Sequence, residues 1–183
     1  MSELNITFGP MFAGKTTFLI NTIKSLLDNS NTNLEEILII NHSSDDRYSN
    51  NSICTHDNNK MPSLSLMKLE DMFNSSIDIS NKKYIFIDEC QFFCDLYESV
   101  KTLLFKYKTK IYLVGLDGDY KQEPFYSSHL FDLIPYANTV TKLTAKCSEC
   151  NETAPFTKRI ICSDEKFLVG GSDSYKPVCL NHL

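Results

Sequence analysis

The sequence feature that most constrains this chain is the segment GPMFAGKT at residues 9–16. It fits the pattern GxxxxGK[ST] of a phosphate-binding loop (P-loop), which lies between a strand and a helix. Residues 5–8 are rich in β-branched and aromatic side chains, and they predict the strand. Apolar residues then recur at helical spacing, so we expect a helix over residues 15–28. The segment therefore predicts a nucleotide site near the N-terminus.

Each part of this loop has a chemical use. Glycines let several backbone N–H groups point at one phosphate, and the helix N-terminus favours a bound anion. The amine of Lys15 can reach the β- and γ-phosphates, and the hydroxyl of Thr16 can ligate Mg²⁺. We therefore assign the ATP phosphates to the whole loop, which comprises Gly9, Pro10, Met11, Phe12, Ala13, Gly14, Lys15 and Thr16.

Continuous apolar runs at residues 37–40, 84–87 and 111–114 have the composition of strands buried on both faces. Residues 96–107 have the pattern of a helix between the last two runs. Strands that alternate with helices predict a parallel sheet with right-handed crossovers. The expected fold class is therefore α/β, with a P-loop NTPase-like core.

The composition changes near Leu143, where short strand-like pieces begin to alternate with cysteines. We therefore divide the chain into a nucleotide-binding core over residues 1–142 and a small metal-binding module over residues 143–183. At 183 residues, the chain is long enough for one buried core and a small appendage.

Carboxylates follow two of the predicted strands. Asp88 ends a buried run, where P-loop proteins hold an acid for Mg²⁺, although an acid there can also cap a turn. Glu89 comes next and could accept a proton from an attacking hydroxyl or water, in a kinase or in an ATPase. Asp45 and Arg47 lie at the carboxyl end of the sheet, where ligands bind, although a solvated loop explains them equally well. They belong to residues 42–63, a polar stretch that we expect to be a long loop.

Two ligand pairs near the C-terminus predict a zinc site. Cys147 and Cys150 form a CxxC pair, and Cys179 and His182 form a CxxH pair. Closed tetrahedral zinc uses three cysteines and one histidine in this way, and four protein ligands leave no open position for water. We therefore expect structural zinc, with a long excursion of the chain between the two pairs.

Composition excludes several classes of protein. A net charge of −5 without a basic stretch argues against a protein that mainly binds nucleic acid. No apolar run approaches the roughly 18 residues that span a membrane, and the N-terminus resembles no signal peptide, so we expect a cytoplasmic protein. Two alternatives to a kinase stay open on these motifs: a P-loop ATPase that acts on nucleic acid, and a nucleotide-binding regulator without catalysis.

The sequence segments around these motifs distinguish between a kinase and the two alternatives. In chain order they resemble the type II, or cellular-type, thymidine kinase family in its compact bacterial and viral form. The matching segments are GPMFAGKT at 9–16, DRYS at 46–49, THD at 55–57, DECQFF at 88–93, LDG at 116–118, LTAxCxxC at 143–150, GG at 170–171 and YxxxCxxH at 175–182. Together they extend over essentially the whole chain.

The resemblance implies transfer of the γ-phosphoryl group of ATP to the 5′-hydroxyl of thymidine, with deoxyuridine as a second substrate. It implies that Glu89 is the general base, that Thr16 and Asp88 hold Mg²⁺, and that Arg47 steadies the phosphates. Asp45 and Gln91 join the ATP-binding set by the same analogy. A homotetramer, with the triphosphate of thymidine (dTTP) as feedback inhibitor, is also implied, in the cytoplasm of a cell or of a virus's host.

The nucleoside pocket is likewise implied by the resemblance. A lasso closed by the zinc would cover the nucleoside and bind the base through main-chain groups. The expected pocket residues are Met11, Phe92, Leu116, Tyr120, Phe125, Lys166, Phe167, Leu168, Val169, Gly170 and Tyr175. Two of this chain's residues depart from the family pattern. Cys90 replaces a small residue, so it could crowd the base and be oxidised, and Tyr120 carries a hydroxyl where phenylalanine is usual.

Overall fold

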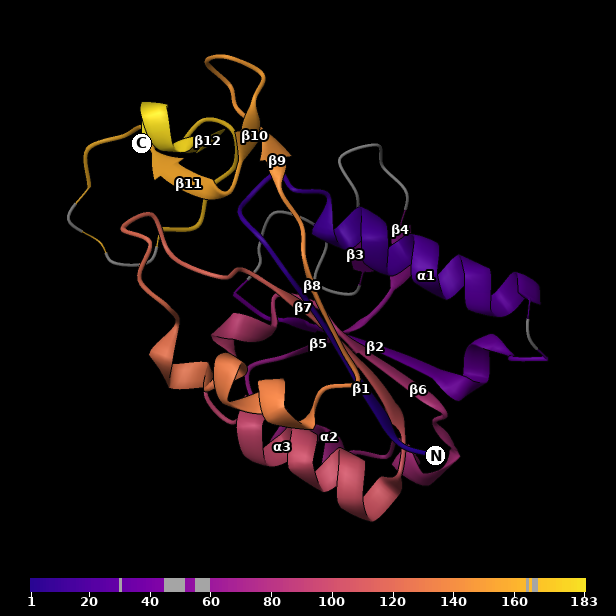
Figure 1. Cartoon of the computed structure of the whole chain (residues 1–183). Coiled ribbons are helices and arrows are strands. Elements are labelled where there is room, and N and C mark those ends of the chain that lie inside the picture. Colours follow the sequence, from indigo (N-terminus) through magenta and orange to yellow (C-terminus); the bar gives the residue numbers. More distant parts are fainter. Residues whose placement is uncertain (30, 45–51, 55–59, 164, 166–167) are drawn as a thin grey trace.

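The computed structural model describes the chain except residues 30, 45–51, 55–59, 164, 166 and 167. Its centre is a six-stranded parallel sheet of strand order β5-β2-β6-β7-β1-β8 (Figure 1). Its strands are β1 (Glu3–Phe8), β2 (Ile37–His42), β5 (Leu64–Leu66), β6 (Tyr84–Ile87), β7 (Lys110–Gly115) and β8 (Thr139–Lys142). The predicted α/β class and parallel sheet are confirmed.

Helices cover both faces of the sheet (Figure 1). On one face, α1 (Lys15–Asn29) buries Leu19, Ile20 and Ile23 against Phe86 and other residues of the central strands. On the other face lie α2 (Glu70–Phe73), α3 (Leu96–Thr102) and short 3₁₀ segments, over a larger apolar cluster. Continuous apolar strands need cover on both sides, and the fold provides it.

The helix expected over residues 96–107 differs in its second half. After α3 the chain continues as a π-helical segment, Leu103–Tyr107, and ends at Lys108, whose φ is +57°. Asp95, just before α3, accepts hydrogen bonds from the backbone N–H groups of Leu69 and Glu70, at 3.1 and 2.7 Å. One carboxylate thereby joins the starts of two helices on this face.

The expectation of a loop throughout residues 42–63 is wrong for the described part. His42 belongs to β2, and β3 (Ser52–Cys54) pairs antiparallel with β4 (Lys60–Pro62). Burial explains the difference, because Ile53 is buried in the cluster under α1 and Met61 packs against that cluster. His56 and the polar residues around it lie outside the described residues.

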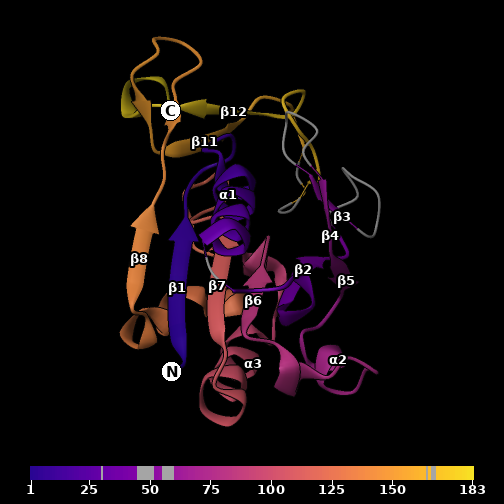
Figure 2. The same cartoon turned by 90° about the vertical axis from the view of Figure 1, so that its right-hand side faces the viewer.

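The C-terminal segment forms two small antiparallel sheets. In the first, β9 (Ala145–Lys146) pairs with β10 (Thr153–Ala154). In the second, β11 (Phe156–Arg159) pairs with β12 (Tyr175–Val178), and a 3₁₀ turn, Leu180–His182, ends the chain. Figure 2 shows these sheets beyond the carboxyl ends toward which β1 and β8 point. The segment thus overhangs the edge of the sheet where α/β proteins bind ligands.

Candidate active site

The P-loop connects β1 to α1. Gly14 has φ of +75°, where a side chain would be strained, and no atom lies within 4 Å of the position that its Cβ would take. The buried Lys15 donates a hydrogen bond from Nζ to the carbonyl oxygen of Pro10, at 2.8 Å. The loop therefore holds the amine of its own lysine by a main-chain carbonyl, and its residues fit the phosphate group that the motif predicts.

Asp88 lies directly beneath this loop, at the end of the central strand β6. Its Oδ2 accepts a hydrogen bond from the hydroxyl of Thr16 at 3.1 Å, so the two predicted Mg²⁺ ligands are neighbours. Burial, and then the adjacent Glu89 carboxylate, raise the pKa of Asp88 to about 7. A buried acid with a hydroxyl beside it is a donor set that suits a hard divalent cation.

Glu89 has a left-handed backbone with φ of +49°, an uncommon conformation for a residue with a Cβ. Its carboxylate accepts a hydrogen bond at 2.7 Å from Nε2 of Gln91. The Oε1 of Gln91 in turn accepts the backbone N–H of Leu116, at 2.9 Å. The fully buried Gln91 amide, which we expected among the ATP ligands, thus connects Glu89 to the end of β7.

Cys90 follows Glu89 but packs inside the core. The residue is fully buried in the larger apolar cluster. Burial, followed by the charges of Asp88 and Glu89, raises the pKa of its thiol well above the ordinary value. Oxidation proceeds through the exposed thiolate, so burial and the raised pKa disfavour the oxidation of Cys90 that the sequence led us to expect.

One cavity of about 690 Å³ joins the P-loop, the acidic pair and the overhanging C-terminal segment. Phe92 and Phe125 meet edge to face in its wall, with ring centroids 5.7 Å apart. The predicted residues that line it are Met11, Phe12, Gly14, Lys15, Thr16, Asp88, Glu89, Gln91, Phe92, Leu116, Tyr120, Phe125, Leu168, Val169, Gly170 and Tyr175. Gly9, Pro10 and Ala13 belong to the loop but not to this lining, and Asp45, Arg47, Lys166 and Phe167 lie outside the described residues.

Several other cavity residues were not anticipated from the sequence, and the contacts of two of them, His42 and Thr157, are informative. His42, at the end of β2, is buried against the ring of Phe93, with centroids 4.7 Å apart. Thr157, in β11, accepts a hydrogen bond from the backbone N–H of Met11 at 2.9 Å. The position of His42 after an apolar run was an available signal. Thr157 carried none, because nothing in its neighbourhood distinguishes it from an ordinary strand residue.

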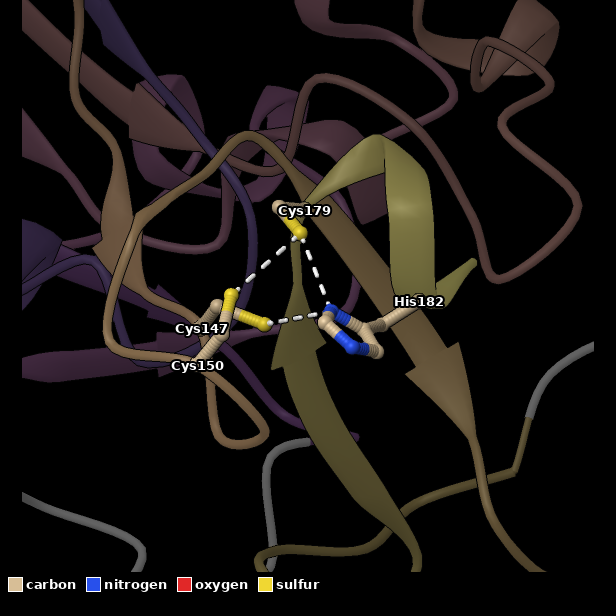
Figure 3. Close-up of side chains that lie close together, drawn as sticks. All are labelled: Cys147, Cys150, Cys179 and His182. Carbon is tan, nitrogen blue, oxygen red and sulfur yellow. Dashed lines mark hydrogen bonds between the residues drawn. The ribbon is translucent and has the colours of Figure 1, made fainter.

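The two predicted zinc-ligand pairs come together within the C-terminal segment (Figure 3). The ligand atoms of Cys147, Cys150, Cys179 and His182 all lie within 4.8 Å of one another. The thiols of Cys150 and Cys179 are 3.7 Å apart, and Nδ1 of His182 is 3.7 Å from the Cys147 sulfur and 3.2 Å from the Cys179 sulfur. Tetrahedral zinc with ordinary bond lengths requires S···S and S···N separations of about 3.8 and 3.6 Å. The four side chains therefore fit a zinc ion.

One thiol of this cluster, that of Cys147, ionises readily. Burial raises the pKa of the Cys147 thiol, but main-chain hydrogen bonds, the largest from Cys179, outweigh it and lower that pKa to about 6. A thiol that ionises this readily offers the thiolate that zinc binds. With four protein donors, the cluster leaves no position for a reacting water, so it can stabilise the fold but not carry out chemistry.

Comparison with known proteins identifies the family. Residues 2–183 match the family model described as Thymidine kinase. The chain is 38% identical over 182 residues to "Thymidine kinase" of Oryza sativa subsp. japonica, which covers 98% of this chain and 65% of that protein. It is 36% identical over 177 residues to "Thymidine kinase, cytosolic" of Homo sapiens, covering 97% and 71%. For "Thymidine kinase" of Monkeypox virus the identity is 35%, covering 97% and 94%.

No helix in the described part of the chain is both long and apolar enough to cross a membrane.

The family match extends from the P-loop strand to the final zinc pair, so it includes the core residues and the C-terminal residues that line the cavity. The chain therefore belongs to the thymidine kinase family.

Proposed function

We propose that this chain transfers the γ-phosphoryl group of ATP to the 5′-hydroxyl of thymidine, and also of deoxyuridine. The observation that carries the proposal is the shared cavity, in which Lys15, Glu89 and an aromatic wall face the same space. A phosphate site alone would suit any ATPase. The apolar wall beside the acid adds a place for a flat nucleoside base next to the phosphates.

The P-loop holds the phosphates of ATP, with Lys15 leaving Pro10 to pair with the transferring group. Thr16 and Asp88 would hold Mg²⁺, which neutralises charge on the phosphate oxygens when it is bound. Asp45 and Arg47 complete this set by analogy with the family. Because phosphoryl transfer needs little covalent help from the protein, positioning and positive charge make the main contribution.

Glu89 takes the proton of the nucleoside's 5′-hydroxyl as its oxygen bonds to the γ-phosphorus and the bond to the leaving ADP breaks. Its left-handed backbone and the hydrogen bond from Gln91 hold the carboxylate in one orientation. We therefore assign Gln91 the role of a positioning residue for the base. Mispositioning of a catalytic group by about 1 Å can cost on the order of 100-fold in rate.

The nucleoside lies between the core and the lasso. Met11, Phe92, Leu116, Tyr120 and Phe125 supply its walls from the core. Main-chain groups of residues 166–170 bind the base, with Tyr175 beside them. Structural zinc anchors both ends of this lasso, so residues 143–183 form a module distinct from the core of residues 1–142. By analogy with the family, we extend the proposal to a cytoplasmic homotetramer that is inhibited by dTTP.

A product assay tests this function. Purified full-length chain, thymidine, ATP and Mg²⁺ should yield thymidine monophosphate and ADP in equal amounts. Lys15→Ala should lose most of this activity while it retains its zinc, because only a charge at the transferring group is removed. If the chain instead hydrolyses ATP only when DNA is added, and forms no nucleoside monophosphate, the ATPase alternative is correct and the proposal fails.

A further inference from the structure

Arg159, the last residue of β11, contacts the core and both ends of the lasso, the chain between β11 and β12. After β11, its Nη1 donates hydrogen bonds to the carbonyl oxygens of Ser163 and Glu165, at 3.3 and 2.6 Å. At the start of β12, its Nη2 donates to the hydroxyl of Tyr175, at 3.0 Å. One guanidinium thus fixes residues that lie up to sixteen positions away along the chain.

The hydroxyl of Tyr175 passes this connection on to the cavity. It donates its own proton to the carbonyl oxygen of Leu168, at 2.8 Å. Leu168 lines the cavity, and it belongs to the stretch whose main chain we propose binds the base. The guanidinium of Arg159 therefore reaches, through one hydroxyl, a backbone group in the part of the lasso that we expect to bind the base.

Arg159 also connects the lasso to the core. Its guanidinium carbon lies 3.7 Å from the ring centroid of Tyr120, in a cation–π stack. Tyr120 follows β7 and lines the same cavity. Arg159 also lies 5.4 Å from the centroid of the Tyr175 ring. The two tyrosines that flank the cavity are therefore held by one cation that is not part of its lining.

We propose that Arg159 is a positioning residue for the nucleoside, which orders the lasso against Tyr120 before the nucleoside binds. The inference rests on the proposed function, since it assumes that a nucleoside occupies the cavity. A lasso that is already ordered leaves less conformational entropy to be lost on binding, and that saving strengthens affinity for the nucleoside. ATP, held mainly by the P-loop, gains nothing comparable.

The contacts require arginine in particular. A planar guanidinium can donate in several directions within its plane while its face stacks on a ring. The ammonium of lysine is a point charge that cannot stack in this way and donate to both arms. Arg159→Lys therefore keeps the positive charge but removes the geometry, which makes it the informative substitution.

Steady-state kinetics with the full-length chain test the proposal. Arg159→Lys should raise KM for thymidine by roughly 10- to 100-fold, since it removes charge-assisted hydrogen bonds that order the site. The KM for ATP and the zinc content should stay close to those of the unsubstituted chain. Lys121→Met is the matched control, because Lys121 also lies over the Tyr120 ring, at 5.6 Å, but projects from the core side. This control should leave both KM values unchanged.

Tyr175→Phe provides a second variant in case Arg159→Lys does not fold. It leaves Arg159 in place and removes only the hydroxyl between Nη2 and the Leu168 carbonyl. A rise in KM for thymidine of roughly 10-fold, with KM for ATP unchanged, is expected, because one hydrogen bond from the charged guanidinium and one neutral hydrogen bond are lost. Equal rises in both KM values, or no rise in either variant, would overturn the proposal.

Hydrogen–deuterium exchange of the ligand-free protein separates this inference from the proposed function. Exchange in residues 160–170 should be faster in Arg159→Lys than in the unsubstituted chain, whether or not thymidine proves to be the substrate. Unchanged exchange there would show that Arg159 does not order the lasso, even in an active thymidine kinase. If exchange rises but no nucleoside is phosphorylated, the ordering role stands and the positioning of a nucleoside fails.

Discussion

The core and the C-terminal segment, which we propose is a separate module, differ in the apolar side chains that they bury. In the core, apolar clusters on both faces of the sheet bury long aliphatic and aromatic side chains such as Phe86 and Phe93. In the module, the buried cluster among described residues consists of Cys147, Ala154, Val178 and Cys179. Two of these four residues, Cys147 and Cys179, are themselves predicted zinc ligands. A segment with so little apolar surface to bury needs another source of stability, and metal binding can supply it.

This difference teaches how the site divides its work. The groups proposed for chemistry, Lys15, Asp88 and Glu89, stand at the ends of strands and helices that the large clusters hold rigid. The groups proposed for nucleoside binding are divided: the aromatic walls belong to the core, whereas the main-chain groups proposed to bind the base belong to the lasso, which we propose that zinc and Arg159 hold. Perturbing the core should therefore change catalysis, and perturbing the module should change nucleoside affinity.

The largest expected effect is on the chemical step in the core. Glu89→Gln keeps the shape of the side chain but removes its affinity for a proton, so kcat should fall by roughly 10²–10⁴-fold. Thymidine affinity and zinc content should persist, because neither depends on the charge of this group. Rapid-quench kinetics and calorimetry measure these quantities. Near-full turnover in Glu89→Gln, with chemistry limiting the rate, would show that another group is the base.

The next effect sharpens the role of Gln91. A Cβ added to Gly115 would lie 2.5 Å from Oε1 of Gln91 and 2.7 Å from the sulfur of Cys90, in a fully packed region. Gly115→Ala should therefore lower stability by about 1–3 kcal/mol, the usual result of overpacking, and lower kcat by displacing the partner of Glu89. Chemical denaturation and steady-state kinetics measure the two effects.

Gly118→Ala is the matched control for this substitution, three residues further along. Its added Cβ would meet its nearest neighbours at 3.5 Å, an ordinary contact, so its unfolding midpoint should not move. Equal destabilisation by both substitutions would mean that close packing around Gln91 is not the cause.

A smaller effect tests the module. His182→Ala removes one zinc ligand, so the ends of the lasso are joined less firmly, by the β11–β12 pairing alone, and closing it on the nucleoside costs more entropy. Thymidine affinity should weaken on the order of tenfold, or about 1.4 kcal/mol, with ATP affinity changed far less. Cys150→Ser should act in the same direction, and elemental analysis should show reduced zinc in both. Equal losses for both ligands would contradict the separation of roles.

Much of the core could be predicted from the sequence because local pattern determines it. Residues 9–16 place a glycine-rich turn between a strand and a helix, and apolar runs mark the central strands. The β3–β4 hairpin could not be predicted in the same way. Its strands are only three residues long, and the burial of Ile53 that holds them depends on α1, which is distant in sequence.

The site shows the same limit. The motifs predicted that Thr16 lies beside Asp88 and that the four zinc ligands lie together, and the structure has both sets within hydrogen-bond or ligand distance. No sequence motif predicts the role of Arg159, because its partners come from three separate segments of the chain. Side chains that act through tertiary contacts, and not through a local motif, become visible only when the chain has folded.

The smallest expected effect asks whether surface charge, and not metal, holds the module together. Lys176 in β12 and Glu149 in the CxxC turn form an ion pair at 2.6 Å, which connects the strand to the zinc cluster. Their side chains are 31% and 41% exposed, so water already solvates both charges and the pair should add little. Lys176→Met should therefore leave zinc content and the thermal unfolding midpoint unchanged within error, in contrast to His182→Ala. If instead Lys176→Met releases zinc as readily as His182→Ala does, the module depends on its surface charges, and the contrast between an apolar core and a metal-held module fails.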